Sequence, residues 1–414
     1  MFRCTTELKG LIIDADSFEE EIDWHIFDVH YKFFFITSDE QISGRLSNQY
    51  GADTVWCVKK YLKLFAPNHV MHGEVLKKMQ LKATEIVYLS KNIQFLQNAM
   101  EFLGGTIWIT DRTINYEEAS NAPDVIVKSI DVLQRFLSNG GEGFYGEVLV
   151  FPEKNKRGVI VPVKFQVDDM IFPLYMLGRY FGYAHYMNQL HPYSSAIYLN
   201  KKEGGRSYGA FNDVFEVIYR NALKRIMENR NVDAICSVPP KPQKENRFAE
   251  IVHKICEELD VDDISEQLKC IKEYPPQKNL SQQEREINIK GVFQCTTDLT
   301  GKNIVILDDV VSTGATLREC IRELKKAGAA NIYIVVLAIN QIKGVYWSSN
   351  EACIKCPVCS SCMRLLINSR QKSFFYSCAH CNATIDFASG RAALCHLVNT
   401  EFMVNEDESE NRQN

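Results

Sequence analysis

Several features that would restrict the function are absent from this sequence. No uncharged apolar run approaches the ~18 residues that a membrane-spanning helix needs. The first apolar run, Leu11 to Ile13, stops at Asp14, so we expect no signal peptide. No internal repeat is present. The formal net charge of -5 gives no general reason to expect a nucleic-acid partner. We therefore expect a cytoplasmic protein that binds no membrane.

What is present is the composition of an ordinary globular protein, with 46% hydrophobic and 24% charged residues. A chain of 414 residues has room for about two or three domains. Fourteen cysteines in an intracellular chain are more typical of reduced thiols and metal ligands than of disulfides. The cysteines therefore direct attention to a metal site.

The most informative stretch runs from Asn303 to Thr316. Its apolar residues, most of them β-branched, predict a buried parallel strand that ends at the paired carboxylates Asp308 and Asp309. A loop of small and hydroxylic residues follows, and apolar residues at helical spacing then predict a helix. Loop amides, hydroxyls and a helix amino terminus are the parts of a phosphate site, and Gly314 lets the backbone approach an anion closely.

Two adjacent carboxylates would repel a phosphate, but they suit the vicinal hydroxyls of a ribose. The stretch therefore predicts a ribose 5-phosphate site, the alternative being a strand whose acidic end caps the next helix. It resembles the phosphoribosyl-pyrophosphate motif of type I phosphoribosyltransferases over its whole length. The resemblance implies Mg²⁺-dependent transfer, with Asp308 and Asp309 at the ribose. It places the 5-phosphate on residues 312–316. The residues that it assigns to phosphoribosyl-pyrophosphate binding here are Val310, Val311, Ser312, Thr313, Gly314, Ala315 and Thr316.

A second strand and turn, Asp233 to Pro240, precede this motif. Three cations just beyond the strand end, Lys241, Lys244 and Arg247, stand where a pyrophosphate would need them. The order of these pieces resembles the ComF-type branch of the type I enzymes over about residues 195–342. The resemblance assigns Pro239, Lys241 and Arg247 to the pyrophosphate. The resemblance also covers a later segment, Gln277 to Phe293. The sequence departs from the branch at Ala249, which replaces an asparagine that is usual there.

The first 138 residues alternate short apolar strands with helical patterns, which predicts an α/β domain. The series resembles the haloacid-dehalogenase-like (HAD-like) phosphohydrolases, and the resemblance implies Asp14 as nucleophile, Asp16 as acid/base and Thr37 as phosphate ligand. The acids that hold Mg²⁺ in that family are replaced by Ser90-Lys91-Asn92, and either Lys63 or Lys77 could match its phosphate-binding lysine. We therefore expect a degenerate domain, with an active phosphatase as the alternative.

The segment 139–194 predicts a connection between two domains. Asn139 to Gly143 is rich in glycine and is typical of a linker. Two strand-like runs, Glu147–Phe151 and Val159–Phe165, predict a hairpin with a basic tip. Phe172 to Tyr186 is dense in aromatic residues and predicts a helical segment. These rings could form a hood that stacks on an acceptor base, but packing in the core is the more common use.

Near the carboxyl end, Cys356, Cys359, Cys378 and Cys381 form the pattern C-x2-C-x18-C-x2-C. Two such knuckles hold Zn²⁺ tetrahedrally, with a small hairpin between them. Cys353 and Cys362 flank the first knuckle at the same spacing, so the sequence does not decide which two of these four cysteines form it. The basic surplus of the segment disappears once four thiolates and zinc are counted, which favours a folding or docking role over DNA binding. The acidic residues 401–414 predict a disordered tail.

These segments predict an α/β architecture with the following parts: a HAD-like Rossmannoid domain (1–138), a hairpin and aromatic segment (139–194), a type I phosphoribosyltransferase domain (195–345), a zinc ribbon (346–400) and an acidic tail (401–414). The predicted function is transfer of ribose 5-phosphate from phosphoribosyl pyrophosphate to a nucleobase-like nitrogen acceptor. Two alternatives stay open: a non-enzymatic sensor of phosphoribosyl pyrophosphate or a nucleotide, and a bifunctional enzyme with a live phosphatase. The outer domains could serve a homo-oligomer or a protein partner.

Overall fold

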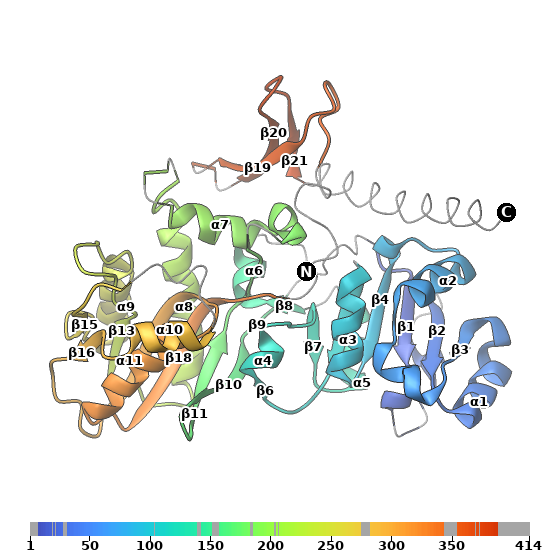
Figure 1. Ribbon diagram of the computed structural model, residues 1–414, viewed down its shortest axis with the longest axis horizontal. Coiled ribbons are helices and arrows are strands. Elements are labelled where there is room, and N and C mark those ends of the chain that lie inside the picture. Colours follow the sequence, from blue (N-terminus) through green and yellow to red (C-terminus); the bar gives the residue numbers. More distant parts are fainter. Residues whose placement is uncertain are drawn as a thin grey trace.

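The computed structural model describes residues 7–18, 20, 22–27, 31–102, 104–138, 142–150, 157–182, 185–202, 204–205, 207–274, 282–342, 354–368, 370–371 and 373–387. Two α/β parts lie side by side, and a small three-stranded sheet lies over the second of them (Figure 1). Within the described ranges, no helix has both the length and the apolar character needed to cross a bilayer.

The first part is a parallel sheet of six strands in the order β3-β2-β1-β4-β5-β7. The four strands predicted from apolar runs are all present. Helices cover both faces, because alternate residues of β1 pack against α2 and α3 on one side and against α1 and α5 on the other. The strands are β1 (Gly10–Asp14), β2 (Lys32–Thr37), β3 (Val55–Cys57), β4 (Ile86–Ser90), β5 (Gly105–Ile109) and β7 (Val125–Val127). The helices are α1 (Glu40–Tyr50), α2 (His69–Met79), α3 (Ile93–Ala99) and α5 (Ile130–Ser138).

The second part is an eight-stranded sheet in the order β14-β13-β17-β18-β11-β10-β6, with β12 beside β18. Its central strands are parallel and almost fully buried, as the apolar run before Asp308 predicted. The strands are β6 (Ile114–Asn115), β10 (Val161–Val167), β11 (Met170–Met176), β12 (Arg179–Tyr180), β13 (Ala234–Ser237), β14 (Asp262–Asp263), β17 (Asn303–Val311) and β18 (Asn331–Asn340). The α/β class is confirmed.

Helices again cover both faces of this sheet. One face of β17 packs against α11, and the other packs against α8 and α9. A small two-stranded antiparallel sheet of β15 and β16 joins the α11 side. The elements are α7 (Pro192–Asn200), α8 (Asn212–Met227), α9 (Ala249–Leu259), α10 (Gln282–Ile289), α11 (Ala315–Lys326), β15 (Leu268–Cys270) and β16 (Phe293–Cys295).

The predicted hairpin across residues 147–165 is wrong. Its first arm is a helix, α6 (Tyr145–Val150), preceded by β8 (Glu142–Phe144), which pairs with β9 (Arg157–Val159). The hairpin partner of β10 is β11 instead, through a turn at Asp168, where φ is +52°. The helix is stabilised by a distant contact, because Glu147 pairs with Arg179. Such tertiary contacts override the strand propensity of a short run.

The predicted aromatic helix over residues 172–186 is also wrong. Phe172 and Tyr175 lie on β11, where Pro173 is tolerated, whereas a proline inside a helix would remove a hydrogen bond. Phe172, Tyr180 and Phe181 are buried, so packing is their role and they are not available to stack on a base. Tyr183 lies outside the described residues.

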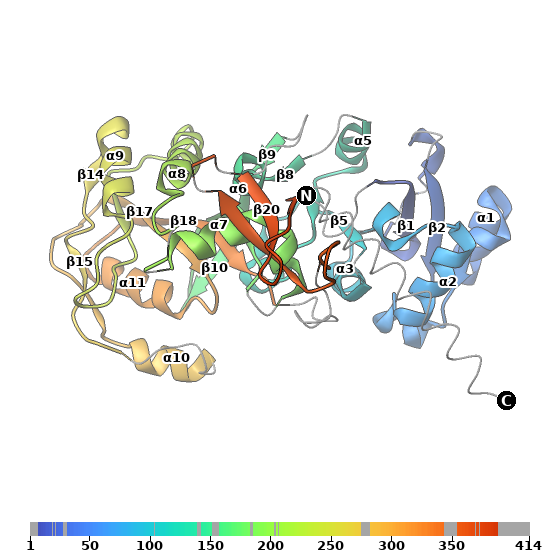
Figure 2. The same cartoon turned by 90° about the horizontal axis from the view of Figure 1, so that it is seen from above.

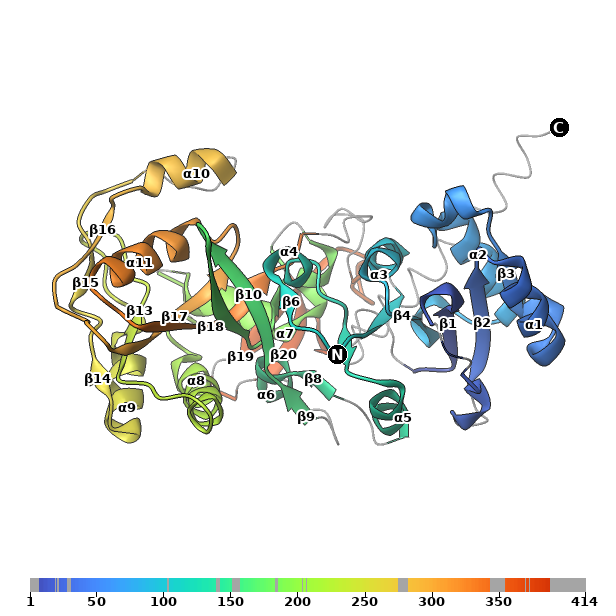
Figure 3. The same ribbon diagram turned by 90° about the horizontal axis from the view of Figure 1, so that it is seen from below.

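The chain passes between the two sheets more than once. After β5 it leaves the first sheet, adds β6 to the edge of the second sheet beside β10, and returns to the first sheet as β7 (Figure 3). The short helix α4 (Tyr116–Ala119) follows β6 directly. Residues 114–119, which the sequence assigned to the first domain, therefore belong to the second.

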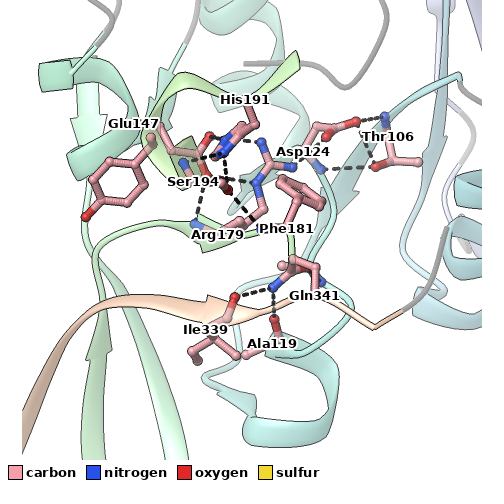
Figure 4. Close-up of polar contacts among 12 residues, drawn as sticks. Thr106, Ala119, Asp124, Glu147, Arg179, Phe181, His191, Ser194, Ile339 and Gln341 are labelled. Atoms are coloured by element: carbon pink, nitrogen blue, oxygen red, sulfur yellow. Dashed lines mark hydrogen bonds and ion pairs between the residues drawn. The ribbon is translucent and has the colours of Figure 1, made fainter. Parts of the chain in front are cut away.

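Buried polar groups join the two parts (Figure 4). The Arg179 guanidinium donates to Asp124 at 2.5 Å and to both carboxylate oxygens of Glu147 at 2.9 and 3.0 Å. Asp124 precedes β7 of the first sheet, and Arg179 lies on β12 of the second. The side chain of Gln341, just beyond β18, donates to the Ala119 carbonyl and accepts from the Ala122 amide.

The small sheet contains β19 (Met363–Asn368), β20 (Ser373–Cys378) and β21 (Thr384–Asp386), all antiparallel. The predicted hairpin around Phe374–Tyr376 is confirmed. Seen from above, the sheet lies over α7 (Figure 2). Phe374 packs on Phe211 beside α8, with ring centroids 6.4 Å apart. The small sheet is therefore docked on the helical face of the second part.

Candidate functional site

The site lies at the carboxyl end of β17, in the middle of the second sheet. Asp308 and Asp309 are near the end of the strand, Ser312 and Thr313 form the loop, and α11 begins at Ala315. Gly314 has φ +78°, a left-handed conformation that favours glycine. A Cβ at Gly314 would lie 2.8 Å from the Phe165 ring, so a side chain would not fit. Strand, loop and helix thus occur where the sequence predicted them.

Two features of the loop suit an anion. The first amides of a helix have no partner within the helix, and α11 presents these at the loop. Among the described residues, no hydrogen bond occupies the hydroxyls of Ser312, Thr313 or Thr316. Thr313 and Thr316 are half-buried and Ser312 is exposed, so all three hydroxyls are available to phosphate oxygens.

The two carboxylates differ in their surroundings. One Asp308 oxygen accepts only the Asp309 amide at 2.9 Å, and the Asp308 carbonyl accepts the Tyr219 hydroxyl at 2.6 Å. Asp309 accepts the Val310 amide at 2.6 Å and Arg247 at 3.0 Å. The ammonium of Lys201, at the end of α7, is 3.6 Å from Asp309. Among the described residues, Lys201 and Arg247 form ion pairs with Asp309, and no cation lies within ion-pair distance of the Asp308 carboxylate.

These surroundings separate the pKa values of the pair. Burial, together with the charge of Asp309, raises the pKa of Asp308 to about 8. Burial also disfavours the charged form of Asp309, but Lys201 and Arg247 outweigh it and hold that pKa below its ordinary value. In the free protein, Asp308 is therefore the more readily protonated carboxyl of the two.

The predicted pyrophosphate residues follow β13, the neighbour of β17. Ser237 is in register with Leu307, so the turn that contains Pro239 lies beside the acid pair. Arg247 contacts Asp309, and Lys241 donates to the Tyr274 carbonyl at 2.8 Å with its ammonium 4.2 Å from the Tyr274 ring centre. Arg247 is therefore at the acid pair, whereas Lys241 faces a neighbouring loop. Gln277 to Ser281 lies outside the described residues.

Sequence reasoning missed two residues of the site. Lys201 has no motif around it and comes to Asp309 only because α7 ends there. Tyr219 lies in the middle of α8, where an aromatic residue at helical spacing is typical of a core position. No local signal in the sequence could have identified either one.

A second polar cluster lies at the carboxyl edge of the first sheet. Lys63 contacts Asp14 at 2.6 Å and Asp16 at 3.2 Å. Asp14 also accepts the Ser90 hydroxyl at 2.7 Å. Asp16 accepts the amide and the hydroxyl of Ser38 at 2.8 and 2.6 Å and the hydroxyl of Thr37. The structure thus brings together the three predicted residues Asp14, Asp16 and Thr37, with Lys63 rather than Lys77 between the carboxylates.

The residues after β4 are unsuited to hold a divalent cation. Ser90 donates to Asp14, and the Asn92 side chain accepts the Gln94 amide at the start of α3. Lys91 is exposed, with its ammonium 5.4 Å from the Phe18 ring centre. Mg²⁺ requires octahedral oxygen ligands, which a lysine between the carboxylates cannot supply. Burial raises the pKa of Asp14, although Lys63 and Ser90 act in the opposite direction.

We expect no Mg²⁺-dependent phosphatase activity from this cluster. The full chain should not hydrolyse a panel of small phosphate esters above background, because Lys63 offsets part of the charge of the two carboxylates but cannot supply the coordination of a metal ion. Asp14→Asn should behave like the wild type. Turnover that disappears in Asp14→Asn would instead show a live phosphatase.

The four predicted zinc ligands lie together. The sulfur atoms of Cys356, Cys359, Cys378 and Cys381 are all within 4.8 Å of one another, and two of the pairs are 3.4 Å apart. Zn–S bonds of about 2.3 Å at tetrahedral angles place sulfurs about 3.8 Å apart, so the cluster fits Zn²⁺. Cys362 is not one of the four, and Cys353 lies outside the described residues. Within the described part, the first knuckle is therefore Cys356 with Cys359.

Comparison with known proteins agrees with this geometry. Residues 213–357 match the family model described as phosphoribosyl transferase domain. Transcriptional regulator GfcR of Methanocaldococcus jannaschii is 33% identical over 75 residues, which are 17% of this chain and 35% of that protein. Competence protein F of Haemophilus influenzae is 30% identical over 83 residues, which are 19% of this chain and 36% of that protein. The chain thus matches about a third of the length of these relatives.

Solved structures give weaker likenesses. Adenine phosphoribosyltransferase from Saccharomyces cerevisiae is 13% identical with a TM-score of 0.22, over 34% of this chain and 72% of that chain. UMP synthase of Leishmania donovani is 12% identical with a TM-score of 0.23, over 76% of this chain and 62% of that chain. Scores this low carry no argument. Residues 213–357, which contain the strand, loop and helix of the site, are thus similar to phosphoribosyl transferase domains, and part of the chain is similar to competence protein F.

Proposed function

We propose that the protein transfers ribose 5-phosphate from phosphoribosyl pyrophosphate to a nitrogen acceptor of nucleobase type. One observation carries the proposal: the acid pair and the unengaged donors of residues 312–316 lie at the same end of β17. A ribose 5-phosphate presents hydroxyls to carboxylates and a phosphate to amides and hydroxyls, and both sets are present within nine residues. No other described site combines the two.

In this reaction the bond from ribose C1 to the pyrophosphate oxygen breaks, and pyrophosphate leaves with the electron pair. The acceptor nitrogen then bonds to C1 and gives up its proton. Positive charge develops on the ribose, so Asp308 and Asp309 would stabilise it while they hold the hydroxyls. Mg²⁺, which fits the phosphate oxygens and these hard carboxylates, would neutralise the leaving pyrophosphate.

Arg247 is the residue best placed to bind that pyrophosphate. It is half-buried, and in the free protein it contacts Asp309 at 3.0 Å. Guanidinium groups bind phosphates through two parallel hydrogen bonds, so an incoming pyrophosphate competes with Asp309 for Arg247. We infer that substrate binding breaks this ion pair and releases Asp309 for the ribose. Lys241 would also bind the pyrophosphate, after its ammonium leaves the Tyr274 carbonyl.

The test is pyrophosphate release by the full chain. Phosphoribosyl pyrophosphate and Mg²⁺ are supplied with each of a panel of nucleobases, and with a cell extract to cover other acceptors. We expect release only when an acceptor is present, with the acceptor-free mixture as the control. Binding measured by calorimetry without release under any condition would contradict transfer.

A sensor of phosphoribosyl pyrophosphate is the second candidate, because one match is to a protein named transcriptional regulator GfcR. It would use the same binding residues, with the outer parts reporting occupancy to a partner. Binding without pyrophosphate release, in the experiment above, is the result this candidate requires.

A further inference from the structure

The back of the candidate phosphoribosyl loop is held by two side chains. The Tyr116 hydroxyl donates to the Ser312 carbonyl at 2.5 Å, and the Arg318 guanidinium donates to the Thr313 carbonyl at 2.8 Å. Across a planar trans peptide, the carbonyl of one residue and the amide of the next point in opposite directions. Holding these two carbonyls at the back therefore turns the amides of Thr313 and Gly314 toward the opposite side.

Two aromatic side chains support the same loop. The rings of Tyr116 and Phe165 meet edge to face, with centroids 5.2 Å apart. The Arg318 guanidinium lies 5.2 Å from the Phe165 ring centre, and the ring also fills the space beside Gly314. Tyr116 is buried, so both its ring and its hydroxyl are fixed by packing. Its contact with Ser312 is thus part of a packed arrangement rather than an isolated bond.

Tyr116 comes from the segment that leaves the first sheet. It begins α4, directly after β6, which pairs with β10. Gln341 fixes the other end of α4 through Ala119 and Ala122, and Arg179 fixes Asp124 further along (Figure 4). The position of the Tyr116 hydroxyl is therefore set by contacts that anchor the segment between β5 and β7 to the second sheet.

We propose that Tyr116 is a positioning residue for the loop 312–316, supplied by the amino-terminal part of the chain. Its hydroxyl holds the Ser312 peptide so that the following amides face the 5-phosphate of phosphoribosyl pyrophosphate. The ligand in this statement rests on the proposed function. The segment between β5 and β7, which the chain adds to the second sheet, then serves this site through its structure, whether or not the polar cluster at Asp14 has a ligand.

The test removes one oxygen atom. Tyr116→Phe keeps the ring against Phe165 and deletes the bond to Ser312. We expect amides 312–316 of the ligand-free full chain to exchange with deuterium several-fold faster. We also expect the affinity for phosphoribosyl pyrophosphate with Mg²⁺, measured by calorimetry, to be about fivefold to tenfold lower, because one hydrogen bond that positions the loop is lost.

Tyr193→Phe is the matched control. The buried Tyr193 hydroxyl donates to the Leu337 carbonyl at 3.0 Å, so this variant loses the same kind of bond in the same sheet. We expect both variants to lose similar thermal stability, and only Tyr116→Phe to change loop exchange and affinity. Equal changes in the two variants would mean general loosening and would overturn the proposal.

The outcomes separate this proposal from the proposed function. If the wild type binds no phosphoribosyl pyrophosphate but Tyr116→Phe still accelerates loop exchange, the positioning role stands and the ligand is wrong. If the wild type binds it and Tyr116→Phe changes neither exchange nor affinity, the ligand stands and the positioning role is overturned.

Discussion

Replacing Asp308 and Asp309 together by asparagine should lower the affinity for phosphoribosyl pyrophosphate at least about tenfold. Asparagine keeps the shape of the side chain and removes its charge. Each hydrogen bond between a carboxylate and a ribose hydroxyl is worth roughly 1.5–3 kcal/mol, and about 1.4 kcal/mol corresponds to a factor of ten. Calorimetry on the full chain with Mg²⁺ measures the change. An unaltered dissociation constant would refute the site.

Asp262→Asn with Asp263→Asn is a matched control, because this exposed acid pair lies on β14 of the same sheet, away from the loop. It should leave affinity unchanged. The single variant Asp308→Asn adds a pH test. Since the pKa of Asp308 is raised to about 8 by burial, wild type gains a carboxylate only as pH rises through that value. The deficit of Asp308→Asn should therefore be small at pH 6.5 and larger at pH 9.

Removing zinc should unfold the small sheet. Binding of a structural zinc contributes about 10–16 kcal/mol in zinc-finger peptides, and this energy is folding energy. The three strands are short, and their core is a small cluster around Phe374, Tyr376 and Phe387. We expect about one zinc per chain, and fast hydrogen exchange across residues 354–387 after chelation. The variant Cys378→Ser with Cys381→Ser should give the same exchange.

Cys57→Ser is the control for this variant, because Cys57 is an exposed thiol on β3 and is not one of the four clustered cysteines. It should keep zinc and exchange protection. The zinc assignment would be wrong if elemental analysis found no zinc in protein purified under reducing conditions.

Local patterns explain which parts could be predicted from the sequence. The strand, loop and helix around Asp308 and Gly314 are contiguous, so their chemistry is readable in one stretch. The cysteine spacing is equally local, and it placed the four sulfurs correctly. The strands that end at Asp14 and Thr37 were found from their apolar runs.

Contacts between distant residues explain what the sequence could not show. Tyr116 and Ser312 are 196 positions apart, and Lys63 and Asp14 are 49 apart. The helix α6 was mistaken for a strand because its Glu147 is fixed by Arg179, which no window around residue 147 contains. In each case a buried partner from another element decides the structure.

The excursion of β6 into the second sheet has a consequence for how this chain can be divided. A cut after residue 138 removes β6 from the edge of β10, leaving unpaired backbone groups that invite aggregation. The remaining piece would also lose Asp124, one of the two carboxylates that pair with the buried Arg179. A chimera that joins halves of two related proteins after residue 138 would therefore be less stable. In evolution, the two halves are expected to be inherited together.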